Sequence, residues 1–303
     1  MTEVVAQLAG VSKAYGKIQA LRGLTLAIPR GSVVGLLGRN AAGKSTALRC
    51  LVGLERADAG TVRVLGQDPR KLDVAARRRF TFLSEQGVPF PAASAADLVK
   101  LCSPLYPDWN RQLELQVLSR FNIDPRRRLR DLSLGQQRAV GLVLAICPQP
   151  ELLILDEPAA NLDAVSRREF LEVILGLVGQ GDRSVIFSSH VLSDVERVAD
   201  RVAILDGGRL LADRALDDLK EQVRRLRFVF DRPPPDDLAI PGALAMRRAG
   251  REILVTVGNY EEGLAGSLAA SLGATAVDDQ RLGLEELFID LVGDDRVPER
   301  DAA

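Results

Sequence analysis

The sequence has few of the residues that stabilise small secreted or metal-binding proteins. It contains 3 cysteines and 1 histidine in 303 residues. The cysteines, Cys50, Cys102 and Cys147, lie far apart and form no C-x-x-C pair. Their spacing argues against a zinc module and fits a reducing cytoplasm.

Long hydrophobic runs are also missing. The longest apolar run, Ala139 to Cys147, ends at Pro148. A membrane-spanning helix needs roughly 20 apolar residues. The N-terminus lacks the basic start and apolar centre of a signal peptide. We therefore expect a chain that does not cross a bilayer.

A strong charge imbalance is absent as well. The 40 Lys and Arg residues nearly balance the 41 Asp and Glu residues, which gives a net charge of -1. Two arginine-rich runs, residues 77–80 and 125–131, carry no interleaved aromatic residues, and we interpret them as solvated helix ends. No nucleic acid partner is expected. The composition, 47% hydrophobic and 27% charged, is that of a globular protein.

The first two thirds of the chain alternate short apolar segments with helical patterns, as in an α/β domain with a largely parallel core. Continuous apolar runs predict strands covered on both faces, at residues 33–38, 80–84, 152–156 and 185–189. Better alternation near the N-terminus predicts an antiparallel layer at the edge. Residues 201–213 predict a hairpin with its turn at Gly207 and Gly208.

The chain contains a helical insertion and a small C-terminal appendage. The insertion covers about residues 89–147. Residues 231–237 read DRPPPDD, which cannot continue a helix or a central strand. Strand-like and helical patterns beyond them suggest an α+β unit. We therefore predict one main domain over residues 1–215, followed by a linker and accessory domain over residues 216–303.

Residues 38–46 read GRNAAGKST and satisfy G-x-x-x-x-G-K-[ST] between a predicted strand and a predicted helix. Glycines let successive N–H groups surround a phosphate, and the helix N-terminus adds partial positive charge. Lys44 can reach the β- and γ-phosphates, and the Ser45 hydroxyl suits Mg²⁺. The alternative is an ordinary glycine turn. The motif predicts a nucleoside triphosphate site built from Gly38, Asn40, Ala41, Ala42, Gly43, Lys44, Ser45 and Thr46.

Polar residues follow two other predicted strands. Asp156 ends a buried strand beside the phosphate loop and would hold Mg²⁺, while Glu157 is placed to orient or deprotonate the attacking water. The alternative is an acidic strand end that pairs with a helix terminus. His190 ends a further strand and can reach a γ-phosphate. A lone histidine is otherwise more often a surface or satisfied core residue.

Three weaker candidates come from strand ends, and one comes from a helix start. Tyr15 could stack on a base or be a simple edge-strand aromatic. Glu85 and Gln86 could reach Mg²⁺ or the water, or be ordinary loop residues. Ser133, in the stretch DLSLGQQ, predicts a helix cap that could also present a hydroxyl and a backbone N–H to a phosphate.

The ordered set of motifs resembles the ABC ATPases over residues 1 to about 215. The set comprises Tyr15, GRNAAGKST, the loop with Glu85 and Gln86, LSLGQQ, LLILDEP, NLD and SSH. The resemblance implies an α/β fold of the P-loop NTPase class and ABC type. Such a fold has a RecA-like core, an antiparallel β layer and a helical subdomain, joined here to the small C-terminal α+β appendage.

The resemblance also implies a role for each matching residue. Tyr15 resembles the aromatic that stacks on adenine, and Glu85, with Gln86 adjacent, aligns with the glutamine that links nucleotide to membrane partner. Ser133, Gly135 and Gln136 match the signature that contacts ATP on the other subunit. The other matches are Lys44, Ser45 and Thr46 for phosphate and Mg²⁺, Asp156 for Mg²⁺, Glu157 as catalytic glutamate, Asp163 in the interface loop, and His190 as switch histidine.

Two positions depart from the family pattern. Ala41 replaces a common glycine, at an open position where we expect a mild effect. Leu134 replaces the first signature glycine, and we expect its side chain to point away from the nucleotide.

The resemblance implies an ATP-binding and ATP-hydrolysing subunit of a bacterial exporter, with ATP and Mg²⁺ as cofactors. It would dimerise with itself or a related ATPase subunit and drive a separate transmembrane permease from the cytoplasmic face of the membrane. The run LYPDWN and the C-terminal appendage support the exporter part. The alternative is a soluble ABC-type ATPase in translation or DNA maintenance, but the paired domains, zinc modules or long coiled coils of such proteins are not seen.

Overall fold

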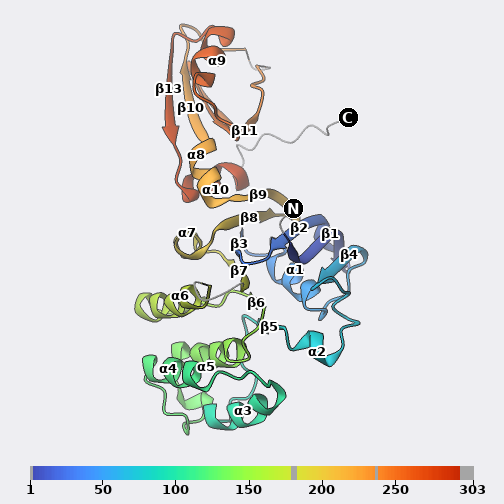
Figure 1. Cartoon of the computed structure of the whole chain (residues 1–303). Coiled ribbons are helices and arrows are strands. Elements are labelled where there is room, and N and C mark those ends of the chain that lie inside the picture. The colour runs from blue at the N-terminus through green and yellow to red at the C-terminus, as the bar shows by residue number, and fades with distance from the viewer. Residues whose placement is uncertain (1–2, 179–182, 236–237, 294–303) are drawn as a thin grey trace. The chain divides into compact units, whose positions relative to one another are not determined.

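The computed structural model describes residues 3–178, 183–235 and 238–293. Contacts divide the chain into two compact units, Met1–Asp213 and Arg214–Ala303 (Figure 1).

The first unit is built on a six-stranded sheet with the strand order β5-β6-β7-β3-β8-β9. The strands are β3 (Val33–Gly38), β5 (Phe80–Leu83), β6 (Leu152–Leu155), β7 (Ser184–Ser189), β8 (Arg201–Asp206) and β9 (Arg209–Ala215). The pairs β5–β6, β6–β7, β7–β3 and β3–β8 are parallel. Every strand predicted from an apolar run is present, and their carboxyl ends share one edge of the sheet.

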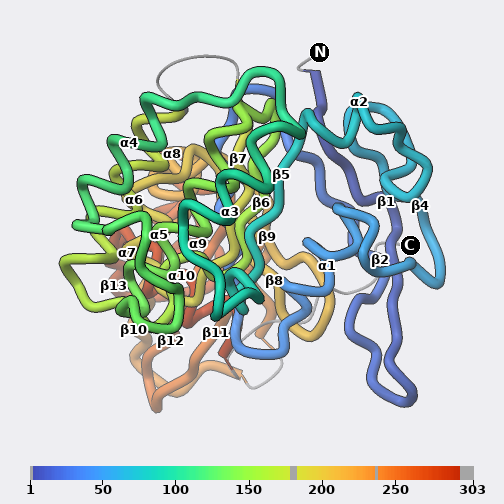
Figure 2. Tube along the Cα trace, turned by 90° about the horizontal axis from the view of Figure 1, so that it is seen from below, coloured from blue at the N-terminus to red at the C-terminus, as the bar shows by residue number. Residues whose placement is uncertain are grey.

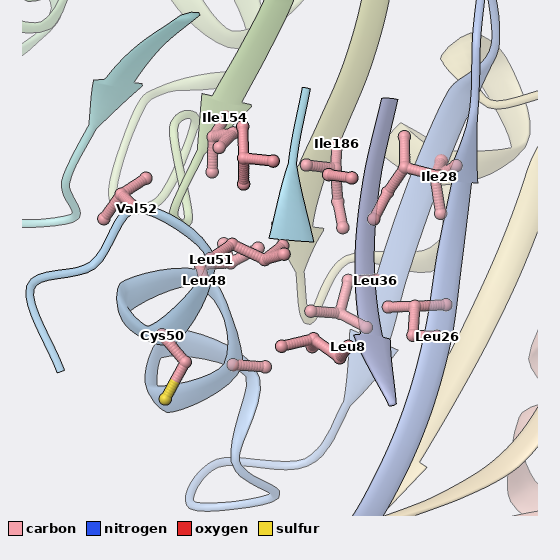
Figure 3. Close-up of a cluster of buried hydrophobic side chains, with 14 of the residues drawn as sticks. Leu8, Leu26, Ile28, Leu36, Leu48, Cys50, Leu51, Val52, Ile154 and Ile186 are labelled. Carbon is pink, nitrogen blue, oxygen red and sulfur yellow. The ribbon is translucent and has the colours of Figure 1, made fainter. Parts of the chain in front are cut away.

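A separate three-stranded antiparallel sheet lies beside this core, as the N-terminal alternation predicts. Its order is β2-β1-β4, formed by β1 (Val4–Tyr15), β2 (Ile18–Pro29) and β4 (Ala59–Val64). Helix α1 (Lys44–Leu51) packs between the two sheets. Figure 3 shows Leu48 and Leu51 of α1 among Leu8 of β1 and Ile154 and Ile186 of the central sheet, all fully buried. This apolar contact fixes the helix that begins at the phosphate loop.

The predicted helical insertion is present. It contains α3 (Ala95–Cys102), η1 (Ser103–Leu105), α4 (Arg111–Arg120), η2 (Leu129–Asp131) and α5 (Leu134–Ile146). These helices gather at one end of the first unit, away from the β1–β2–β4 sheet (Figures 1 and 2). The remaining helices of this unit are α2 (Val74–Arg77), α6 (Ala164–Val178) and α7 (Leu192–Val198).

The second unit is a four-stranded antiparallel sheet with helices. The sheet order is β11-β12-β10-β13, from β10 (Arg224–Val229), β11 (Ala243–Ala249), β12 (Glu252–Val257) and β13 (Ala276–Arg281). The helices are α8 (Leu216–Gln222), α9 (Leu264–Leu272) and α10 (Leu284–Val292). The hydrophobic core of the unit lies between the sheet and α9.

Two strands of this second unit were not predicted from the sequence. In β10, Leu226 and Phe228 are buried in the core while Arg225 and Arg227 alternate with them. Strand β13 reads AVDDQR and is largely exposed. The alternation in β10 is short and follows directly on α8, and β13 has only one apolar residue that is partly buried, Val277. The DRPPPDD stretch has neither helix nor strand over residues 231–235, and residues 236–237 lie outside the described part of the chain.

Among the described residues, no helix is both long enough and apolar enough to span a membrane.

Candidate nucleotide-binding and hydrolysis site

One pocket of about 600 Å³ gathers most of the predicted phosphate-site residues. Those that line it are Tyr15, Asn40, Ala41, Ala42, Gly43, Lys44, Ser45, Thr46, Glu85, Glu157 and His190. Ile18, Gln19, Ala20, Ala160 and Asn161 line it as well, and the sequence patterns did not single them out. Outside the lining lie Gly38, Gln86, Ser133, Gly135, Gln136, Asp156 and Asp163.

At two positions of the phosphate loop the close approach of other backbone atoms requires glycine. Gly43 has φ +104°, and a Cβ there would lie 2.5 Å from the Ala20 carbonyl oxygen. At Gly38 a Cβ would lie 2.5 Å from the Leu205 carbonyl oxygen. Only a residue without a side chain fits such close backbone approaches.

Ala41 adopts φ +65°, the left-handed region that favours glycine. Alanine at this position therefore carries a backbone cost that glycine would not. The residue is exposed, but an L-residue in this conformation costs roughly 1–2 kcal/mol. Glu157 (φ +46°) and Asn161 (φ +61°), which also line this pocket, share this conformation. Strained residues of this kind concentrate at functional sites.

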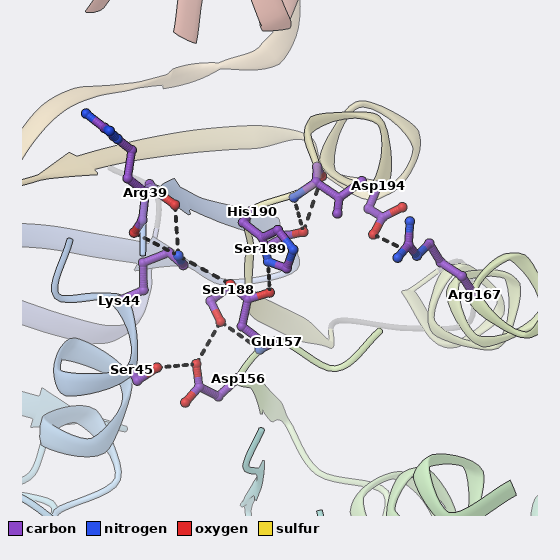
Figure 4. A network of polar contacts seen from close by, with 12 residues as sticks. Arg39, Lys44, Ser45, Asp156, Glu157, Arg167, Ser188, Ser189, His190 and Asp194 are labelled. Carbon is purple, nitrogen blue, oxygen red and sulfur yellow. Dashed lines mark hydrogen bonds and ion pairs between the residues drawn. The ribbon is translucent and has the colours of Figure 1, made fainter. Parts of the chain in front are cut away.

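Lys44 connects the phosphate loop to the end of β6. Its buried Nζ donates to the carbonyl oxygens of Gly38 (2.8 Å) and Arg39 (3.3 Å) and lies 3.2 Å from Glu157 Oε1. The other carboxylate oxygen of Glu157, Oε2, lies 2.8 Å from His190 Nδ1 (Figure 4). A carboxylate only accepts hydrogen bonds, so Nδ1 is the donor in this contact when Glu157 is ionised, and Nε2 is left for another partner.

Asp156 connects three segments of the site, although its own side chain is not among those that line the pocket. Its fully buried Oδ1 accepts hydrogen bonds from the hydroxyls of Ser45 (2.9 Å) and Ser188 (2.8 Å). Ser188 in turn accepts from the backbone N–H of Glu157 at 2.8 Å. Asp156 Oδ2 is buried and has no hydrogen-bond partner among the described residues. Ser188 was not predicted, because its partners Asp156 and Glu157 come from the end of another strand.

An ion pair between a buried carboxylate and a partly exposed arginine supports the helix that follows His190. Asp194, in the first turn of α7, lies 3.9 Å from Arg167 Nε of α6. Burial raises the pKa of the Asp194 carboxyl, and the Arg167 guanidinium opposes that shift. This contact ties α7 to α6, the helix that begins just after Asp163.

The predicted signature forms a helix cap. Ser133 Oγ accepts from the Gln136 N–H at 3.2 Å, and Gln136 Oε1 accepts from the Ser133 N–H at 3.1 Å. The Gln136 Nε2 also donates to the carbonyl oxygens of Phe121 and Asn122, after α4. Leu134 follows the cap and is 43% exposed. The helix start is thus held by reciprocal local bonds and lies at the surface.

Gly135 and Asp163 are explained by contacts within the same chain. A Cβ at Gly135 would lie 3.0 Å from the Ser166 hydroxyl of α6. Asp163 accepts from the N–H groups of Val165 and Ser166 and from the Ser166 hydroxyl. These bonds hold the pKa of the Asp163 carboxyl below its usual range. The signature and the Asp163 loop therefore lie side by side on one surface.

Two loop residues after β5 were predicted as site residues, and of these Glu85 lines the pocket and Gln86 does not. Arg138 of α5 reaches this loop and donates to the Ser84 carbonyl oxygen at 3.3 Å. Burial lowers the pKa of the Arg138 guanidinium, and the nearby Glu85 carboxylate counteracts the shift. Arg138 therefore connects the signature helix to the Glu85 loop, and no sequence motif pointed to it.

A parallel core sheet, a phosphate loop between strand and helix, and carboxylates at the next strand end define the class of P-loop proteins that bind nucleoside triphosphates. Comparison with known proteins identifies the family. The sequence model described as ABC transporter matches residues 21–160.

Two relatives and one solved structure illustrate the similarity. It is 31% identical over 225 residues to the ABC transporter ATP-binding protein YtrB of Bacillus subtilis (strain 168), covering 74% of this chain and 77% of that protein. It is 30% identical over 311 residues to the daunorubicin resistance ATP-binding protein DrrA3 of Streptomyces coeruleorubidus, covering 98% of both. A solved ATP-binding subunit of an ABC transporter is 26% identical, with a TM-score of 0.64 over 72% of this chain and 92% of that chain.

The chain therefore belongs to the family of ABC transporter ATP-binding proteins. It is an ATP-binding subunit of that family, and its enzymatic activity is ABC-type ATP hydrolysis.

Proposed function

We propose that this subunit energises a bacterial exporter by binding ATP between two nucleotide domains and hydrolysing it with Glu157. The observation that carries the proposal is the arrangement of Glu157 between Lys44 Nζ (3.2 Å) and His190 Nδ1 (2.8 Å) in one pocket. A carboxylate held between the phosphate-binding lysine and a histidine is placed next to the position of a γ-phosphate. There it can orient or deprotonate the attacking water.

In this proposal the phosphate loop binds the triphosphate. The residues from Gly38 to Thr46 supply backbone N–H groups and the start of α1, and Lys44 exchanges its contact with Glu157 for phosphate oxygens. His190 offers Nε2 toward the γ-phosphate, since Nδ1 is engaged by Glu157. Tyr15, 42% exposed at the rim, stacks on the base.

The residues fit Mg²⁺. The Asp156 Oδ2 atom is buried and unpartnered within the described part of the chain, and the Ser45 hydroxyl lies beside the same carboxylate. No cluster of three or more His, Cys, Asp or Glu side chains suited to a metal occurs among the described residues. Mg²⁺ commonly takes one or two protein groups together with phosphates and waters. Ser45 and Asp156 would hold it, with Glu85 or Gln86 nearby, and it would neutralise charge on the β- and γ-phosphates.

The signature residues act on the ATP of the other subunit in this proposal. Ser133, Gly135 and Gln136 do not line the pocket of their own chain, and Leu134 is exposed beside them. A second copy, or a related ATPase subunit, would bring this surface over the γ-phosphate, with Asp163 at the same interface. Closure on ATP and opening after hydrolysis would then move the permease.

We assign residues 1–215 to the ATPase domain, with residues 89–147 as the helical subdomain that docks on a cytoplasmic loop of a separate permease. Residues 216–303 would form the accessory domain. This places the subunit in the cytoplasm, at the inner face of the cell membrane. The similarity to DrrA3 over 98% of both chains supports the exporter assignment, because that relative is a daunorubicin resistance ATP-binding protein.

The test is Glu157→Gln, which keeps the size of the side chain and removes its basicity. Hydrolysis should fall by at least about 100-fold, because general base catalysis contributes factors of this size. ATP binding should persist, and size-exclusion chromatography with ATP should show a stable dimer.

The matched control is Glu221→Gln, on the exposed surface of α8, which should keep wild-type turnover. A Glu157→Gln protein that remains monomeric at saturating ATP would contradict the dimer. Undiminished hydrolysis would contradict the role of Glu157.

A further inference from the structure

The ring of Tyr15 has a lysine on one face. The Nζ of Lys13 lies 5.4 Å from the ring centroid. Lys13 and Tyr15 both belong to β1, whose pairing with β2 is irregular between Lys13 and Ala14, and the ring contact itself brings the two side chains together. Tyr15 lines the nucleotide pocket, whereas Lys13 does not. Lys13 therefore contacts the ring without lining the pocket itself.

Asp58 holds this lysine in place. Its Oδ1 accepts from Lys13 Nζ at 3.2 Å, and its Oδ2 accepts from the Ala14 N–H at 2.7 Å. The Asp58 N–H donates to the Ser12 carbonyl oxygen at 2.9 Å. The Lys13 side chain is only 14% exposed, although lysine is ordinarily among the most exposed residues. Three bonds from Asp58 thus fix the strand segment that precedes Tyr15.

The two groups remain charged in this arrangement. The Ala14 N–H and the Lys13 ammonium hold the pKa of the Asp58 carboxyl below its usual range. Hydrogen bonding to Asp58 raises the pKa of Lys13. Both shifts in pKa favour the charged forms of the two groups.

A cation behind an aromatic ring has a definite physical effect. The faces of an aromatic ring carry negative charge, so two directly stacked faces repel each other. An ammonium group within about 6 Å of one face is attracted to the ring and draws electron density toward itself. The opposite face becomes less negative and stacks more favourably on an electron-rich base.

We propose that Lys13, anchored by Asp58, is a positioning residue that orients and polarises Tyr15 for stacking on the nucleotide base. The inference rests on the proposed function, because it takes Tyr15 to be the base-stacking residue. Lys13 acts through Tyr15 and touches neither the phosphates nor the reacting water. Its contribution is therefore confined to the part of the affinity that depends on the base.

The experiment compares ATP with inorganic tripolyphosphate, which has the phosphates and no base. The dissociation constants of both ligands, with Mg²⁺, are measured by calorimetry on the full chain. The ratio of the tripolyphosphate constant to the ATP constant reports how much the base contributes to binding. Lys13→Met should weaken ATP binding by about threefold to tenfold and leave tripolyphosphate binding unchanged. Lys13→Arg, which retains a cation, should restore the ratio.

Two further variants separate the charge from the fold. Asp58→Asn keeps an acceptor for the Ala14 N–H but loses the anchoring charge, so it should lower the ratio less than Lys13→Met does. Lys17→Met is the matched control, because Lys17 is an exposed lysine in the same hairpin. Its loss of charge should affect both ligands alike and leave the ratio unchanged.

Each alternative outcome has its own meaning. If Tyr15→Ala lowers the ratio and Lys13→Met does not, the role of Lys13 is overturned and base stacking stands. An equal loss of both ligands in Lys13→Met would show a merely structural or electrostatic role and would also overturn it. A ratio insensitive to Tyr15→Ala would remove base stacking, and with it this inference. A wild-type protein that binds neither ligand would contradict the proposed function itself.

Discussion

The cluster around Asp156 and the start of α5 both offer polar groups to a phosphate, but they are held in different ways. Asp156 is fully buried, and its partners Ser45 and Ser188 come from segments far away in the chain. Ser133 is held by Gln136, three residues on, in a cap at the surface. One site is fixed by the packing of the sheet and the other by local bonds.

This difference determines how each site can work. Buried hydrogen bonds between distant segments resist change, because breaking one leaves an unsatisfied polar group away from water. A surface cap can exchange its partners for a ligand at little cost, since water or phosphate replaces them. The Asp156 cluster therefore suits reaction chemistry that needs fixed geometry. The capped helix suits a contact that forms and breaks with each cycle.

The largest effect is expected from Ser133→Arg, which tests whether the capped helix acts on a phosphate. Turnover should fall by at least about 100-fold, a loss typical for removal of one transition-state donor. ATP binding to the wild-type pocket should persist, because Ser133 does not line it. Steady-state hydrolysis and equilibrium ATP binding measure the two quantities.

Ser119→Arg is the matched control, because Ser119 is an exposed serine of α4 in the same helical insertion. It should keep wild-type turnover. An equal loss of binding and hydrolysis in Ser133→Arg would mean that Ser133 only caps α5. The proposed difference in function between the Asp156 cluster and the start of α5 would then be wrong.

A smaller effect, on stability, is expected from Ser188→Ala in the buried cluster. The variant removes a donor to Asp156 and leaves the Glu157 N–H without its acceptor. An unsatisfied buried group costs about 1–3 kcal/mol. Urea denaturation followed by circular dichroism measures the change in the free energy of unfolding.

The comparison variant is Ser119→Ala, whose exposed hydroxyl should change stability by less than about 0.5 kcal/mol. If Ser188→Ala were equally neutral, the buried hydrogen bonds would not be what fixes Asp156 and Glu157.

The two sites also differ in how far sequence reasoning could reach them. The strands predicted from apolar runs are present, and parallel strands share one edge, so Lys44, Glu157 and His190 could be placed near one another. Ser133 could be predicted as a cap because its partner is three residues away. Ser188 and Arg138 could not be predicted, since their partners are set by the register of distant segments. Strand β10 was missed because its short alternation at Leu226 and Phe228 follows directly on the helical pattern of α8.

The smallest effect is expected in the phosphate loop, where two adjacent alanines should respond with opposite signs. Ala41 has φ +65°, so Ala41→Gly removes strain and should raise the free energy of unfolding by about 0.5–1 kcal/mol. Ala42 is buried and is not among the residues with positive φ. Ala42→Gly should therefore lower stability by a similar amount, because glycine gives the unfolded chain more freedom. Urea denaturation of both variants gives the two signs. If both variants lost stability, the left-handed backbone at Ala41 would carry no strain. The phosphate loop would then be held by local bonds, as the start of α5 is.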